Sequence, residues 1–131
     1  MGFVRYLLDT CTFIWLALPQ GKLSPNATEA LNNPASELFF SDASIWEVSL
    51  KHSTGKLALP AEPRKWLPSR LAFFHVQALP LTREAIFRSG ELPRTHADPF
   101  DRMLAAQAIE SGLTILSPDT PLSLLGASRI W

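Results

Sequence analysis

Residues 96–108 read HADPFDRMLAAQA and predict the beginning of a buried helix. Asp98 is a favourable N-cap residue, and Pro99 suits the first helical position, where the missing N–H of proline loses no hydrogen bond. Apolar residues recur at the four-residue spacing of a buried helical face, at Phe100, Leu104 and Ala108. Because Asp98 and Asp101 are three residues apart, we expect both carboxylates on one face at the N-terminal end of this helix.

On both sides of this helix, short apolar runs alternate with helical segments. The predicted strands are residues 4–8, 37–41, 73–79 and 113–116, followed by an edge strand at 128–131. The other predicted helices are residues 12–18, 24–31, 44–52, 64–71 with an interruption at Pro68, and 82–88. Strands that alternate with helices imply a parallel sheet covered on both faces. We therefore expect an α/β fold, a three-layer α/β/α sandwich with a mainly parallel central sheet, in one domain over residues 1–131.

The composition is that of a folded domain without a strong net charge. Of the 131 residues, 47% are apolar, which is enough for a hydrophobic core, and 12 Lys and Arg residues balance 12 Asp and Glu residues. This balance gives no bulk attraction to nucleic acid or to a membrane surface. Cys11 is the only cysteine, so no internal disulfide forms, and no apolar run reaches membrane-spanning length. We expect a soluble, cytoplasmic protein with no membrane partner.

Acidic residues gather where the predicted strands end. Asp9 follows the first strand, Asp119 follows the fourth, Glu47 lies early in the helix after the second, and Asp98 and Asp101 begin the helix before the fourth. Ligands of parallel sheets bind at the carboxyl ends of the strands. Several carboxylates at that edge would repel one another without a cation, and Mg2+ takes oxygen ligands. The set therefore favours a metal site of the kind used in metal-assisted phosphodiester cleavage.

Each of these acids also has a structural interpretation when it is taken singly. Asp9 and Asp119 could cap the segments that follow them, and Ser44 and Glu47 have the spacing of a capping box. The three histidines show no zinc-ligand spacing, and only His96 adjoins the acidic residues. Cys11 is interpreted as a packed thiol, since no base lies near it in the sequence. The metal site is favoured because the acids converge as a set.

The pattern resembles the PIN-domain ribonucleases, specifically the VapC-like toxins of bacterial toxin–antitoxin pairs. The resemblance is carried by Leu7-Leu8-Asp9-Thr10, Ser44-Ile45-Trp46-Glu47, residues 98–108, and Leu116-Ser117-Pro118-Asp119, which span nearly the whole chain in the family's order. It implies that Asp9, Glu47, Asp101 and Asp119 are the family's four acidic positions, and that Asp98 matches an extra acid found in part of the family. It further implies an endoribonuclease that depends on Mg2+ or Mn2+, forms a homodimer, cleaves an RNA substrate and is inhibited by a cognate antitoxin.

Within this interpretation each residue has an expected role. Asp9 and Asp101 are expected to bind the metal directly, with Asp98 as a further ligand. Glu47 and Asp119 are expected to act through water or to position the attacking water. The expected contacts to phosphate, water or substrate come from Thr10, Ser117 and Arg102.

Two other functions are compatible with parts of the sequence. Phosphatases of the haloacid dehalogenase type also begin with a strand, an Asp and a nearby Thr, but they need a second Asp where this chain has Cys11. A binding module that kept the fold and lost its activity is the non-enzymatic alternative, and the intact set of acids argues against it.

Overall fold

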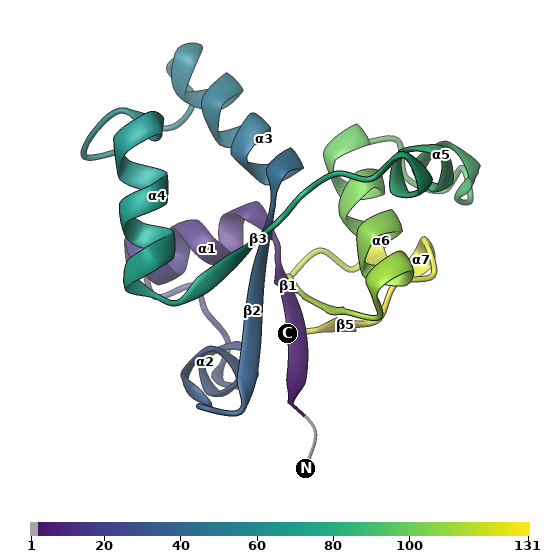
Figure 1. Cartoon of the computed structure of the whole chain (residues 1–131), viewed down its shortest axis with the longest axis horizontal. Helices are drawn as coiled ribbons and strands as arrows, with labels where there is room; N and C mark the ends of the chain where they lie inside the picture. The colour runs from purple at the N-terminus through teal and green to yellow at the C-terminus, as the bar shows by residue number, and fades with distance from the viewer. Residues whose placement is uncertain (1–2) are drawn as a thin grey trace.

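The computed structural model describes residues 3–131 and has a parallel sheet at its centre (Figure 1). Over these residues the sheet has five strands in the order β3-β2-β1-β4-β5, and every pairing is parallel. The strands are β1 (Val4–Leu8), β2 (Ser36–Ser41), β3 (Val76–Leu79), β4 (Thr114–Leu116) and β5 (Arg129–Ile130). The predicted α/β class with its parallel central sheet is confirmed.

Helices cover both faces of this sheet. They are α1 (Thr10–Ala17), α2 (Pro25–Asn32), α3 (Asp42–Ser53), α4 (Pro63–Phe73), α5 (Arg83–Glu91), α6 (Pro99–Ser111) and α7 (Pro121–Leu124). In Figure 1, α1 to α4 lie on the left of the sheet and α5 to α7 on the right. Over residues 3–131, no helix combines the length and the apolarity that a bilayer crossing requires.

Two apolar clusters hold the three layers together. Alternate side chains of a strand point to opposite faces, so Tyr6 and Leu8 join the cluster under α1 to α4, while Leu7 joins the cluster under α6 and α7. Phe13 of α1 and Phe40 of β2 lie at the centre of the first cluster, with ring centroids 4.9 Å apart. Burial on both faces explains the apolar runs at residues 6–8, 38–40 and 115–116 in the three central strands.

The helix predicted from residues 96–108 begins and ends as expected. The Asp98 carboxylate accepts hydrogen bonds from the backbone N–H groups of Phe100 (2.8 Å) and Asp101 (3.2 Å), as an N-cap does. Gly112 ends the helix in the left-handed conformation, with φ of 66°, which an L side chain would find strained. This helix, α6, therefore presents its first turn to the carboxyl edge of the sheet.

Three local predictions were wrong. The third strand begins at Val76 and not at residue 73, because α4 continues to Phe73 and the chain turns at His75, where φ is 55°. Pro68 does not interrupt α4, since the buried side chains of Trp66 and Leu67 anchor that turn of the helix.

The third error concerns the beginning of α3. Its N-cap is Ser41, whose Oγ accepts a hydrogen bond from the Ala43 N–H at 3.0 Å, so Ser44 lies inside the helix. The capping-box interpretation of Ser44 and Glu47 therefore fails, and the Glu47 carboxylate is available for another contact.

Candidate functional site

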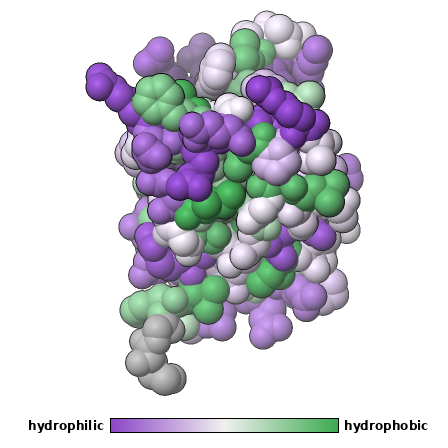
Figure 2. Space-filling model, turned by 90° about the vertical axis from the view of Figure 1, so that its right-hand side faces the viewer, coloured by the Kyte–Doolittle hydropathy of each residue, from purple (hydrophilic) through white to green (hydrophobic). Residues whose placement is uncertain are grey.

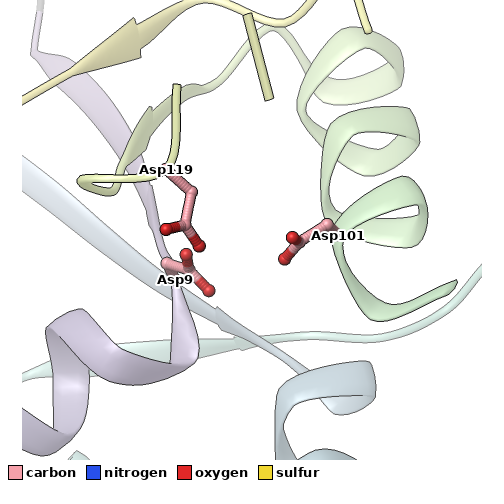
Figure 3. Close-up of side chains that lie close together, drawn as sticks. All are labelled: Asp9, Asp101 and Asp119. Carbon is pink, nitrogen blue, oxygen red and sulfur yellow. The ribbon is translucent and has the colours of Figure 1, made fainter. Parts of the chain in front are cut away.

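Three carboxylates meet at the carboxyl edge of the sheet. Asp9 follows β1, Asp119 follows the neighbouring strand β4, and Asp101 lies in the first turn of α6. Within the part of the chain that the structure describes, these three form the one group whose potential ligand atoms all lie within 4.8 Å of one another. Figure 3 shows Asp101 pointing from α6 toward Asp9 and Asp119. The predicted convergence of these three acids is thus present in the structure.

Asp9 is held rigidly by its neighbours. One carboxylate oxygen accepts a hydrogen bond from the Thr10 N–H at 2.7 Å, and the other accepts one from the Ser117 hydroxyl at 2.6 Å. The Ser117 oxygen in turn accepts from the Asp119 N–H at 3.0 Å. Ser117 is fully buried and directs its proton to Asp9, so in this structure its hydroxyl holds a carboxylate in place. Its predicted contact with substrate stays a prediction.

Glu47 lines the same cleft but is engaged by protein donors. The Thr10 hydroxyl donates to Oε1 at 2.6 Å, and the Lys51 ammonium donates to Oε2 at 2.5 Å. The hydrogen bond to Glu47 raises the pKa of Lys51, which keeps that ammonium charged. Glu47 lies outside the group formed by Asp9, Asp101 and Asp119. Thr10, which was expected to orient phosphate or water, directs its proton to Glu47.

The two acids of α6 differ in their surroundings. Asp101 Oδ2 lies 2.7 Å from His96 Nε2, and its carboxylate faces the other two aspartates. Asp98 is exposed, uses Oδ1 as the helix cap, and reaches the cleft only as part of its lining. The structure therefore brings Asp98 to the cleft but not into the group of three carboxylates.

The side chain of Arg102, which was predicted to contact substrate, is directed into the protein in this structure. Its side chain is buried and donates to four backbone carbonyl groups, those of Ser89, Leu92, Pro93 and His96, at 2.7–3.0 Å. These bonds use four of the five N–H donors of the guanidinium. The sequence alone does not tell whether Arg102 binds backbone carbonyl groups or phosphate, because both roles need a guanidinium at this position.

The carboxylates shift each other's ionisation. Burial raises the pKa of Asp9 to about 7, and the charges of Asp101 and Asp119 contribute in the same direction. Burial also raises the pKa of Asp101, as do the charges of Asp98 and Asp119. Asp9 is buried, Asp101 is partly buried and Asp119 is exposed, so the group opens to solvent on one side. Carboxylate oxygens brought this close together fit a hard divalent cation, whose charge would stabilise them.

The neighbouring thiol is inert. Burial and the charge of Asp9 raise the pKa of Cys11 to about 12, so the thiol stays protonated at neutral pH and is a poor nucleophile. This agrees with the packed thiol expected from the sequence.

The cleft around the acids has a volume of about 400 Å3 and carries both signs of charge. Its wall includes Lys51 and Lys56 beside the acids, together with Trp15 and Gln20. Sequence reasoning missed Trp15 and Gln20, because neither belongs to a motif and only the folding of α1 over the sheet edge brings them to the cleft. The cleft therefore has ammonium groups on the same wall as its carboxylates.

The sequence matches the PIN domain family over residues 6–126. A search of curated proteins found no match. The fold is similar to FitAcB from Neisseria gonorrhoeae, with a TM-score of 0.67, 18% identity, and 96% of each chain covered. It is also similar to VapBC2 from Rickettsia felis bound to a promoter DNA fragment, with a TM-score of 0.65, 16% identity, and 97% of this chain and 98% of that chain covered. For a toxin–antitoxin complex from Klebsiella pneumoniae, the TM-score is 0.59, the identity 18%, and the coverage 88% and 87%.

The raised pKa of Asp9 predicts how stability depends on pH without metal. Between pH 4 and 7 the folded protein binds more protons at Asp9 than the unfolded chain, so the free energy of unfolding should fall as pH rises through this window. The loss attributable to Asp9 should be on the order of 2–4 kcal/mol. Urea unfolding in EDTA at pH 5 and pH 7.5 measures it. The variant Asp9→Asn should show a flatter pH dependence, while Asp42→Asn, at an exposed acid of α3, should keep the parent slope. Equal slopes for the parent and Asp9→Asn would contradict the assignment.

Proposed function

Since the chain belongs to the PIN domain family, we propose that it is a metal-dependent endoribonuclease that acts as the toxin of a toxin–antitoxin pair. The observation that carries the proposal is the group of Asp9, Asp101 and Asp119, with potential ligand atoms within 4.8 Å of one another in a cleft that also holds lysines. Family membership favours RNA phosphodiester cleavage over the phosphatase alternative. The remaining alternative is a binding module without activity, and a failure to cleave RNA in an assay would indicate it.

In this proposal the three aspartates hold Mg2+ or Mn2+. A divalent ion held there would supply Lewis-acid chemistry for a phosphoryl oxygen and for an attacking water. Ser117 keeps the Asp9 carboxylate in place, and the Asp119 N–H keeps Ser117 in place. Glu47 has lone pairs left on both oxygens, with which it orients a water in the cleft.

The lysines of the cleft bind the RNA backbone. Lys51 gives one of its three N–H donors to Glu47, which leaves two for phosphate oxygens and fixes the position of the ammonium. Lys56, in the segment after α3, lines the same wall and adds a second positive charge. Such contacts hold the RNA by its phosphate backbone and do not distinguish one base sequence from another.

A second surface suits the antitoxin. The groove between α3 and α4 has a volume of about 700 Å3, and its lining combines the apolar Ile45, Leu67 and Leu71 with polar and charged side chains. An amphipathic helix places its apolar face into a groove of this kind. Because α3 also carries Glu47, a segment in the groove lies against the helix that forms one wall of the cleft. We assign this groove to a helical segment of the antitoxin.

A third surface suits a second copy of the chain. Trp46 of α3 is 60% exposed, and its ring lies 5.2 Å from that of Phe100 of α6, at a hollow of about 230 Å3 that Leu81 also lines. Ile86 of α5 is exposed, and it lies one helical turn before Gly90, which lines this hollow. Figure 2, seen from the side of α5 to α7, shows apolar side chains at the surface among polar ones. We assign the hollow to the two-fold interface of a homodimer.

Loss of one aspartate should abolish both metal binding and RNA cleavage. Asp101→Asn and Asp119→Asn each remove a charged oxygen ligand while the fold is kept. Calorimetric titration with Mn2+ and cleavage of single-stranded RNA by antitoxin-free protein measure the two effects, with Asp42→Asn as the matched control. Cleavage at the parent rate by both variants would overturn the metal assignment.

A charge in the α3–α4 groove should release the antitoxin without harming the nuclease. Leu71→Glu puts a carboxylate among the apolar side chains of the groove, so co-purification with a co-expressed antitoxin should be lost while RNA cleavage persists. Leu124→Glu, at an exposed position of α7 that does not line the groove, should leave the complex intact. A stable complex of the Leu71→Glu protein would place the antitoxin elsewhere.

The dimer assignment predicts a change of mass on substitution of Trp46. Trp46→Glu adds a charge to the apolar hollow, so sedimentation at micromolar concentration should change from a dimer to a monomer. The Leu124→Glu protein should sediment as the parent does. A monomeric parent, or a dimeric Trp46→Glu protein, would contradict the assignment.

A further inference from the structure

The segment that connects α5 to α6 is fastened to α6 by a single buried side chain. Arg102 Nε donates to the Ser89 carbonyl at 3.0 Å, Nη2 donates to the Leu92 carbonyl at 2.8 Å, and Nη1 donates to two further carbonyls of the segment. Four of the five N–H donors of the guanidinium are thus used on residues 89–96. Because Arg102 follows Asp101 directly, the fastening point lies beside the carboxylate group.

The last of the four carbonyl groups belongs to His96. Its backbone oxygen accepts from Arg102 Nη1 at 2.9 Å, and its ring Nε2 lies 2.7 Å from Asp101 Oδ2. The side chains of His96 and Asp101 are both partly buried, with exposed fractions of 24% and 14%. His96 is therefore fixed at its backbone by Arg102 and at its ring by Asp101, while Asp101 Oδ1 has no hydrogen bond among the described residues.

This contact addresses a physical problem of the site. Asp101 faces two other carboxylates, and without a bound cation their repulsion favours rotation of its side chain away from them. A hydrogen bond from the imidazole holds one oxygen and leaves the other directed at the cleft. Outer hydrogen-bond partners of metal-binding carboxylates typically contribute 10–100-fold to metal affinity or activity.

We propose that His96 is a positioning residue for Asp101, and that Arg102 is the clamp that presents His96 to it. The proposal rests on the metal-binding function proposed above and extends it to two residues outside the acidic group. It also accounts for the burial of a charged side chain beside the site, since only a guanidinium fork reaches four carbonyl groups at once.

The test compares substitutions at His96. His96→Ala removes the ring donor, whereas His96→Gln keeps an N–H donor at a similar distance from the backbone. Affinity for Mn2+ by calorimetric titration should fall about 10-fold in His96→Ala and recover in His96→Gln. In RNA cleavage, His96→Ala should lower kcat with little change in KM. His75→Asn, at an exposed residue of positive φ, is the control and should keep the parent values.

A variant of the clamp gives an independent measurement. Arg102→Lys keeps the positive charge but loses the fork, so it should lower Mn2+ affinity as His96→Ala does. Thermal melting in EDTA shows whether the Arg102→Lys protein is folded. If it is not folded, the His96 variants alone test the proposed role of His96. In a double variant, Arg102→Lys with His96→Ala, the losses of affinity should not add, because the clamp acts through His96.

The outcomes are separable. Parent-like Mn2+ affinity of His96→Ala, when the parent binds Mn2+, would overturn this inference alone. Parent-like affinity with a lowered kcat would mean that His96 acts on the substrate, which also overturns it. A parent that binds no Mn2+ would overturn the proposed function and this inference together.

Discussion

Three carboxylates whose oxygens lie within 4.8 Å repel one another, and much of the fold serves to keep them together. The parallel pairing of β1 with β4 places Asp9 beside Asp119, and the cap of α6 directs Asp101 toward both. Hydrogen bonds from Ser117 and Thr10 prevent Asp9 from turning away. Burial then raises the pKa of Asp9 to about 7, so the site has an unfavourable charge of its own at neutral pH. Strain of this kind, held in place by the surrounding structure, is typical of functional sites.

The positions of the acids follow from simple rules applied to the sequence. A parallel sheet collects ligands at the carboxyl ends of its strands, so residues that follow two neighbouring strands must meet there. The ends of α6 could be predicted because Asp98, Pro99 and Gly112 have strong positional preferences. These predictions required only the knowledge of which helix or strand each residue belongs to. Short sequence motifs give that information.

The direction of each side chain could not be predicted in the same way. Ser44 and Glu47 have the spacing of a capping box, yet the helix begins two residues earlier, and Glu47 bonds to Thr10 across the cleft. Arg102 turns from the cleft to four carbonyl groups of a segment whose path the sequence does not reveal. At Pro68, tertiary burial outweighs local preference. In each case the deciding partner is distant in the sequence.

The α3 helix gives three consecutive side chains to three different surfaces. Successive residues of a helix project about 100° apart, so Ile45 faces the α3–α4 groove, Trp46 the apolar hollow and Glu47 the cleft. Under the assignment of the groove proposed above, substitutions at groove positions would alter which partner is accepted, while the face of α3 that carries Glu47 stays unchanged. On that assignment, the chemistry of the acidic site and the choice of protein partner are free to evolve separately.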